Sequence, residues 1–324
     1  MTSTRALLPI PIATALAGVL ALAGCTTPAQ SGWSLTPVSI EAGLSASATD
    51  TFLPLELTSD TRGGFWGESE GVWIHVNAAG VTTESLPGAT IGDGWRLSGA
   101  TALSPTRILV STVWIDGEHF GEILLVDTAT SQQRSILKRD RGIGDVATAG
   151  GVIYFTEYEA GTAIFTVRGL ELASGNMWDV ASVDGDGALA SIDADEKSNV
   201  YVATESARTV MDNSGTVITS ESRVARNPGV AVSPGGSVIW IDDSTPNQTQ
   251  SFWVSDGSRA ARAIIDEHTD CAYSNLTVRS EWGEATIDFL CEPSGVAWLS
   301  DEKFAVSIGD EGGAPLVEVV PSWR

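Results

Sequence analysis

Histidine, the commonest general base in enzymes, occurs only three times in the 324-residue chain, as His75, His119 and His268. His75 lies in a predicted strand, where core or surface packing is expected, and His119 lies in a turn. A catalytic triad needs a nucleophile, a base and an orienting group placed together. The chain has no phosphate-binding loop or redox-cofactor motif. The sequence therefore identifies no catalytic residue.

Acidic side chains beside apolar runs are better placed to bind a ligand. If the strands form a ring, residues at the strand ends reach the rim of its central channel. Carboxylates are ligands for Ca²⁺, so a calcium ion is one alternative, although no cofactor is expected. Solvated turn acids are the other alternative. The candidate rim residues are Glu68, Asp145, Glu157, Asp193, Glu205, Asp242, Asp243 and Asp310.

Cys25 carries a different chemistry. Arg5 precedes an apolar stretch at residues 6–22, and Leu22-Ala23-Gly24-Cys25 follows. A charged start, an apolar core and small residues before a cleavage site are typical of a secretory signal. These four residues resemble the lipobox of bacterial lipoproteins. The resemblance implies cleavage before Cys25, diacylglyceryl transfer to its thiol and acylation of the new amine. An uncleaved anchor, or an ordinary signal with a chance cysteine, is the alternative.

Several acyl chains hold a protein stably at a bilayer. We therefore expect a lipid-anchored protein at the outer, extracytoplasmic face of the cell membrane. Small and polar residues after Cys25 predict a flexible linker. The expected division is a signal peptide at residues 1–24, a linker at residues 25–47 and a folded domain at residues 48–324.

Cys271 and Cys291 are the remaining cysteines. In an exported protein, such a pair predicts a disulfide. The bond would close a loop of ~20 residues, worth about 3 kcal/mol in the chain-entropy model. Two free thiols, or a metal-binding pair, are the alternatives.

The charge balance excludes one class of partner. The chain has 18 basic and 41 acidic residues. Such an excess of negative charge opposes binding to nucleic acid or to anionic headgroups, so no nucleic-acid partner is expected. A solvated acidic surface that keeps the protein soluble explains the excess most simply.

Strands in a repeated pattern must position these residues. Residues 228–243 alternate small and apolar side chains, turn at Ser233-Pro234-Gly235-Gly236 and continue in an apolar run, as expected of two paired strands. Looser copies recur with marks spaced by 35, 47, 44, 39 and 66 residues, the first four of which lie near the ~40–50 residues of a four-stranded propeller blade. The marks are Gly64, Gly99, Val146, Ala190, Gly229 and Gly295.

The pattern predicts an all-β fold, a six-bladed β-propeller of four-stranded antiparallel blades, with five or seven blades as alternatives. Radial stacking covers the faces of sheets that cannot bury them alone. Segments 122–127 with 134–137, 163–167 with 177–180, and 251–254 with 261–265 are expected to be third and fourth strands. Segments 276–278 and 286–290 form a further predicted hairpin. A strand near residues 51–57 is expected to close the ring beside residues 316–320.

These repeats resemble the six-bladed propellers of the NHL and SMP-30/gluconolactonase-like group. The resemblance implies, for the gluconolactonase-like enzymes, a divalent ion in the channel that activates water. No ligand of that family can be matched residue by residue. Trp66, Trp240 and Trp298 lie in apolar runs, so core packing is favoured over a sugar-binding surface.

Two functions remain open. The first is a membrane-tethered binding or scaffold module for an envelope protein, peptide or glycan. The second is a metal-dependent hydrolase like the SMP-30 group. A convergence of at least three carboxylates would favour the enzyme.

Overall fold

The structure is a computed structural model, in which the chain divides into two units, Met1–Ser31 and Gly32–Arg324. All described residues lie in the second unit. They are 33–37, 56–60, 62–69, 72–79, 82–87, 95–114, 120–222, 228–233, 235–243, 274–280, 283–289, 293–300, 303–308 and 316–321. Within these ranges, no helix has the length and apolar character needed to traverse a bilayer.

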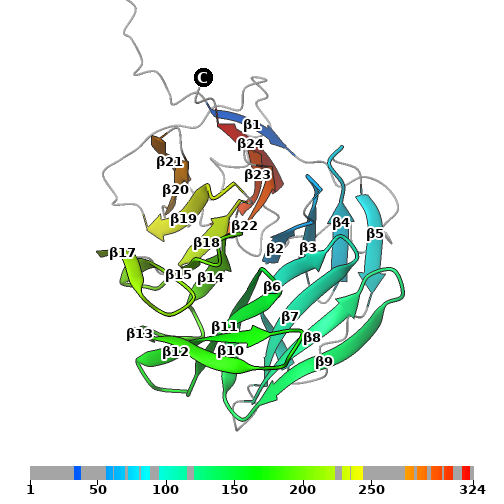
Figure 1. The fold of residues 1–324 in the computed structure, drawn as a ribbon. Coiled ribbons are helices and arrows are strands. Elements are labelled where there is room, and N and C mark those ends of the chain that lie inside the picture. Colours follow the sequence, from blue (N-terminus) through cyan, green and yellow to red (C-terminus); the bar gives the residue numbers. More distant parts are fainter. Residues whose placement is uncertain are drawn as a thin grey trace, which may run out of the picture. The chain divides into compact units, whose positions relative to one another are not determined.

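The second unit contains six antiparallel sheets of four strands (Figure 1). The first is β2 (Glu56–Ser59), β3 (Phe65–Ser69), β4 (Val72–Val76) and β5 (Thr82–Pro87). The second is β6 (Trp95–Ser104), β7 (Arg107–Trp114), β8 (Phe120–Asp127) and β9 (Gln132–Arg139). The third is β10 (Gly142–Ala149), β11 (Val152–Tyr158), β12 (Ile164–Glu171) and β13 (Met177–Asp184).

The remaining sheets follow the same order, except at the closure. The fourth is β14 (Ser191–Ala194), β15 (Val200–Ala203), β16 (Ala207–Met211) and β17 (Val217–Ser222). The fifth is β18 (Gly229–Val232), β19 (Val238–Asp243), β20 (Ser274–Ser280) and β21 (Gly283–Phe289). The sixth is β22 (Pro293–Ser300), β23 (Lys303–Ile308), β24 (Leu316–Pro321) and β1 (Trp33–Pro37).

The first strands of the six sheets form a closed ring. Each of β2, β6, β10, β14 and β18 contacts the next, and β22 contacts both β18 and β2. This arrangement is a β-propeller, and the predicted fold class is confirmed. Hydrogen bonds show that the inner strands β14 and β18 run parallel. The Val230 amide donates to the Ser191 hydroxyl, and two residues later on both strands the Val232 amide donates to the Asp193 carboxyl.

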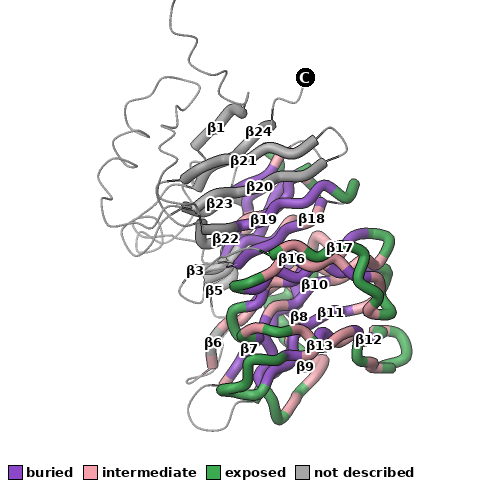
Figure 2. Tube along the Cα trace, turned by 90° about the vertical axis from the view of Figure 1, so that its left-hand side faces the viewer, coloured by how far each residue is buried: buried purple, intermediate pink, exposed green. Residues whose placement is uncertain are grey.

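Apolar side chains fill the spaces between neighbouring sheets. Trp66 packs against Ile108 and Val110 between the first and second sheets. Trp240 joins a cluster between the fourth and fifth. The second strands β7 and β11 are mostly buried, whereas the outer strands β9 and β17 are mostly exposed and the outer strand β13 is mostly of intermediate exposure (Figure 2). Each sheet thus buries its faces on its neighbours, which explains the ring.

Trp66, Trp240 and Trp298 are core residues, as predicted, with exposed fractions of 0%, 2% and 2%. The Trp298 indole also donates a hydrogen bond to the Ala231 carbonyl, across sheets six and five. A sugar-binding role for these three rings is therefore wrong.

The closing strand differs from the prediction. β1 (Trp33–Pro37) pairs with β24, whereas residues 56–57, expected there, belong to inner strand β2. β1 also lies inside residues 25–47, which the sequence analysis assigned to a linker, so that part of the range belongs to the propeller. The general idea that an N-terminal strand completes the last sheet is correct.

Two repeat assignments also need correction. Gly64 aligns the first repeat with units such as residues 228–243, which begin with an inner strand, but the strands after Gly64, β3 and β4, are the second and third strands of their sheet. The third and fourth strands of sheet five are β20 and β21, the predicted hairpin, rather than segments 251–254 and 261–265, which lie outside the described residues. β19 and β20, on either side of residues 244–273, pair directly and belong to one sheet.

Candidate functional site

Asp145 lies on inner strand β10 and bonds to the next inner strand. Its Oδ2 accepts hydrogen bonds from the Ile192 amide at 2.8 Å and the Ser191 hydroxyl at 3.0 Å, both on β14. Its Oδ1 accepts the Val146 amide at 2.7 Å. On the other side, the backbone of Gly99 in β6 is so close that a Cβ there would lie 2.2 Å from Oδ1. Asp145 therefore joins three adjacent sheets.

Asp193 repeats this arrangement one sheet further on. Its Oδ2 accepts the Val232 amide of β18 at 2.6 Å, and its Oδ1 accepts the Ala194 amide at 2.7 Å. The inner edge of each first strand has no strand partner, and its N–H groups need acceptors. Asp145 and Asp193 supply these acceptors at two consecutive sheet boundaries. We call the two residues the ring carboxyls.

Both ring carboxyls have raised pKa values. Each residue keeps some accessible surface, but protein encloses the carboxyl, and this burial raises the pKa of Asp145 to about 6 despite three hydrogen bonds that lower it. Burial raises the pKa of Asp193 to about 7, and the nearby charges of Asp145 and Asp195 add to the rise. Desolvation thus outweighs the amide bonds, and the ring carboxyls change charge near neutral pH.

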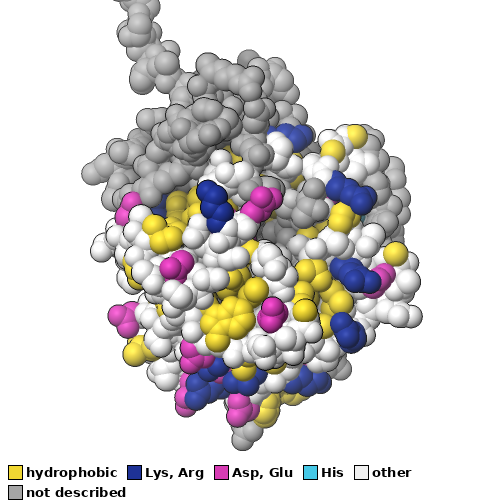
Figure 3. All heavy atoms as spheres, viewed as in Figure 1, with side chains coloured by type: hydrophobic (Ala, Val, Ile, Leu, Met, Phe, Trp, Pro, Cys, Tyr) yellow, Lys and Arg dark blue, Asp and Glu magenta, His cyan; other side chains and the backbone are white. Residues whose placement is uncertain are grey.

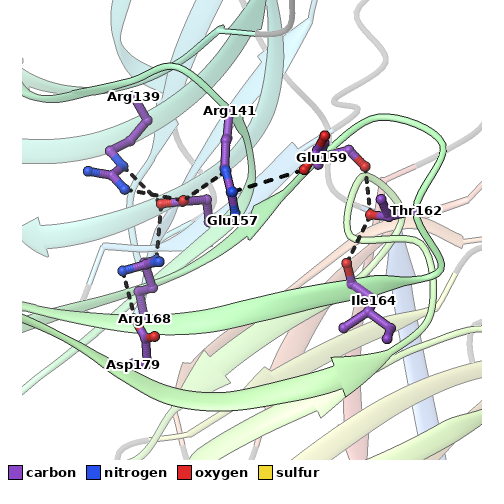
Figure 4. Close-up of polar contacts among 8 residues, drawn as sticks. All are labelled: Arg139, Arg141, Glu157, Glu159, Thr162, Ile164, Arg168 and Asp179. Carbon is purple, nitrogen blue, oxygen red and sulfur yellow. Dashed lines mark hydrogen bonds and ion pairs between the residues drawn. The ribbon is translucent and has the colours of Figure 1, made fainter.

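Glu157, another predicted candidate, lies in an ion network rather than at an open rim (Figure 4). It is 2% exposed on β11. Arg139 of β9 donates to it twice, at 2.9 and 3.2 Å. The Nε of Arg168 lies 3.1 Å from Oε2 as an ion pair without hydrogen-bond geometry, and its Nη1 reaches Asp179 at 2.7 Å. The network joins sheets two and three.

A second pair of acids orders the turns after inner strands. Asp60 follows β2, accepts the Arg62 and Gly64 amides and bonds to His75 Nε2 at 2.8 Å. Asp195 follows β14 and accepts the Lys197 and Asn199 amides. The partners lie two and four residues on in both turns. This Asp-x-x-x-Gly/Asn spacing is readable in the sequence, although neither acid was among the predicted candidates.

None of the other predicted rim candidates is seen in contact with the ring carboxyls among the residues that the structure describes. Glu205 is exposed in the turn between β15 and β16. Glu68 lies on β3, and Asp242 and Asp243 end β19, but their side chains are outside the description. Asp310, His119, His268 and all three cysteines lie outside the described residues. The lipidation of Cys25 and the Cys271–Cys291 disulfide stay predictions.

Among the described residues, no three His, Cys, Asp or Glu side chains form a group that could hold an ion. Asp145, Asp193 and the Ser191 hydroxyl are oxygen donors on the neighbouring strands β10 and β14, and hard oxygen donors suit Ca²⁺. Their oxygens already accept hydrogen bonds from the ring, so a metal ion would compete with those bonds or use the lone pairs that remain.

Aromatic residues that the sequence analysis did not single out lie at one end of sheet two. Trp95 begins β6, Trp114 ends β7 and Phe120 begins β8, so antiparallel pairing places them together. The Trp95 and Trp114 rings meet edge-on at 5.8 Å, and Phe120, opposite Trp114, is 39% exposed. We call this end of the sheets, where the inner strands begin, the entry face.

Comparisons with known proteins support the fold alone. No protein-family model and no curated protein sequence matches the chain. A Bacteroides thetaiotaomicron protein of unknown function is similar in structure, with a TM-score of 0.54, 10% identity and coverage of 89% of this chain and 76% of that one.

Two gluconolactonase structures are also similar. One, described as a putative gluconolactonase, has a TM-score of 0.53 and 9% identity, and covers 89% of this chain and 92% of its own. A gluconolactonase from Xanthomonas campestris has a TM-score of 0.52 and 12% identity, with coverage of 89% and 98%. Propellers of the predicted group are thus among the structural neighbours.

Proposed function

We propose that this propeller is a lipid-anchored binding module on the outer face of the cell membrane, and that its ligand is an envelope protein. The observation that carries the proposal is the bonding of the ring carboxyls. Asp145 and Asp193 accept five hydrogen bonds from the ring itself. In a channel enzyme, such carboxylates would bind the substrate or a metal ion. Here Asp145 and Asp193 bond neighbouring sheets to each other.

A rigid ring suits binding because little order is lost when a partner docks. Glu157 and its arginines add a second connection between sheets two and three. The lipobox supplies the tether, and β1 begins at the eighth residue after Cys25. Eight extended residues span at most ~29 Å, so the anchor keeps the propeller close to the membrane surface.

The alternative is a metal-dependent, gluconolactonase-like hydrolase. The structural likeness to two gluconolactonases favours it, as does the proximity of Asp145 to Asp193. In that case Asp145, Asp193 and Ser191 would hold a Ca²⁺ ion. A bound divalent ion supplies a Lewis acid that lowers the pKa of water. The chain's own part would be to orient those oxygens on the rigid inner strands.

The tether gives a first prediction. The variant Cys25→Ala removes the thiol that is acylated, and without acyl chains the domain has no stable hold on a bilayer. We expect the wild type in the membrane fraction after cell breakage and high-salt washing, and the variant in the soluble fraction or retained as precursor. Metabolic labelling with a fatty acid is the readout. A variant that stays labelled in the membrane would refute the tether.

Two experiments test the binding function against the hydrolase. Photo-crosslinking of the full-length protein in intact cells is expected to give one discrete adduct with an envelope protein. For the purified full-length protein in detergent, the rate of aldonolactone hydrolysis is expected to equal the buffer rate with or without Ca²⁺. Lactone turnover that EDTA abolishes, and that Asp145→Asn and Asp193→Asn reduce by tenfold or more, would replace binding with the hydrolase.

A further inference from the structure

The entry faces of sheets two and three are continuous. Arg139 near the end of β9 pairs with Glu157 near the end of β11, so these strand ends lie together. The loop at residues 185–190, which leads into β14, packs at the same end. The Thr156 hydroxyl donates to the Gly187 carbonyl, and the Gly185 amide donates to the Ala163 carbonyl.

This continuous end carries most of the exposed apolar side chains that the structure describes. Three of the five exposed large hydrophobic residues in the described ranges lie here: Phe120 at 39%, Ile164 at 57% and Leu189 at 43%. Ile164 begins β12, and Leu189 lies in the loop before β14. With the partly exposed Trp95 and Trp114, they form what we call the entry patch. Exposed aromatic and aliphatic residues grouped in this way are typical of interaction sites.

The other two exposed hydrophobic residues provide a comparison. Val217 and Ile218 are each 55% exposed and begin β17, after the turn at residues 212–216. In an antiparallel sheet, the start of the fourth strand lies at the end opposite the start of the first. They are therefore equally apolar and exposed, but they lie away from the entry face.

Acids surround the entry patch. Among the described residues at these strand ends and loops, Asp140, Glu159, Asp184 and Asp186 are exposed, against two exposed cations, Lys138 and Arg141, which pair with Glu122 and Glu159. Figure 3 shows, on one face of the protein, hydrophobic side chains reaching the surface among acidic and basic ones. The excess of acidic side chains around the entry patch repels the phosphates of nucleic acids or anionic lipids, and it attracts lysine and arginine.

We propose that the entry patch binds a protein segment whose apolar side chains are flanked by lysine or arginine. This proposal rests on the binding function proposed above and names its surface. Trp95, Trp114 and Phe120 offer rings to either kind of ligand, but Ile164 and Leu189 extend the patch with aliphatic surface that suits the apolar side chains of a peptide better than a glycan. Apolar contact supplies affinity, and the acids select for the basic flanks.

The test uses full-length protein in zwitterionic nanodiscs and fluorescent 15-residue peptides, followed by fluorescence polarisation. One peptide has a Trp and Leu centre flanked by lysines, a second replaces the lysines by glutamates, and a third replaces the apolar centre by serines. We expect binding of the first only, weakened several-fold by added salt. The triple variant Phe120→Ser/Ile164→Ser/Leu189→Ser should lose at least tenfold affinity. The control Val217→Ser/Ile218→Ser should bind like the wild type.

Equal binding of the lysine and glutamate peptides, or no binding of the lysine peptide, would overturn the proposal. Equal losses in the triple variant and the control would do the same. Thermal unfolding checks that both variants are folded. If the triple variant is not folded, the single variants Ile164→Ser and Leu189→Ser take its place in the binding measurement. If the triple variant still forms the wild-type cross-link in cells, this surface is wrong while the binding function stands.

Discussion

Replacing Glu157 by alanine is expected to lower the free energy of unfolding by about 3 kcal/mol, the low end of the cost of removing one partner from a buried ion pair. Glu157 is 2% exposed and faces Arg139 and Arg168, whose side chains are 27% and 17% exposed. Without the carboxylate, two mostly buried guanidinium groups lose their shared anion. Urea unfolding of the full-length protein in detergent measures the change.

Glu159→Ala is the matched control. Its side chain is 68% exposed and lies 4.0 Å from Arg141, so its loss should cost less than about 1 kcal/mol. A double-mutant cycle of Glu157→Ala with Arg139→Ala isolates the contact between sheets. If Glu157→Ala costs no more than Glu159→Ala, the network does not hold the two sheets together.

Stability should fall as the pH rises from 5 to 8 because of the ring carboxyls. Their pKa values are raised from 3.8 to about 6 and about 7 in the folded protein. The folded protein therefore keeps protons that the unfolded chain releases above pH 4. This stabilisation is complete below about pH 4 and is lost as the pH passes through 6 and 7. The shifts of Asp145 and Asp193 correspond to on the order of 3 and 4 kcal/mol. Urea unfolding at pH 5, 6, 7 and 8 measures it.

Asparagine variants give the control for this pH dependence. Asp145→Asn and Asp193→Asn keep a neutral side chain of the same shape and one carbonyl acceptor, so each should flatten the profile. Asp212→Asn should leave the slope unchanged, because hydrogen bonds already hold the pKa of Asp212 below its usual value. A slope that persists in the Asp145→Asn/Asp193→Asn double variant would show that other groups cause it.

The repeated strands could be predicted because alternation and turn residues are local. The pairs β6–β7, β10–β11, β14–β15, β18–β19 and β22–β23 match the expected units. The first unit was misassigned because β2 is a four-residue strand whose end is marked only by the Asp60 turn. The closing strand was missed because β1 pairs with the far end of the chain, and local composition carries no record of that partner.

The site could be predicted only as a set of residues. Asp145, Asp193 and Glu157 were among the candidates, since each stands beside an apolar run. Their roles depend on Ile192, Val232 and Arg168, which come from other strands and depend on the register of the ring. The entry patch was missed for the same reason. Trp95, Trp114 and Phe120 start or end three strands, and only their pairing brings them together.

The central claim is that Asp145 and Asp193 bond the sheets of the ring to one another and do not bind a metal ion. Thermal unfolding with added Ca²⁺ tests this claim most directly. Full-length protein in detergent is treated with EDTA, dialysed and titrated with Ca²⁺. The expected result is a Tm that Ca²⁺ leaves unchanged in the wild type and in Asp145→Asn/Asp193→Asn alike. An ion present at 100 times its Kd would add about 2.7 kcal/mol of stability. A Tm rise of several degrees in the wild type that disappears in the double variant would contradict the claim.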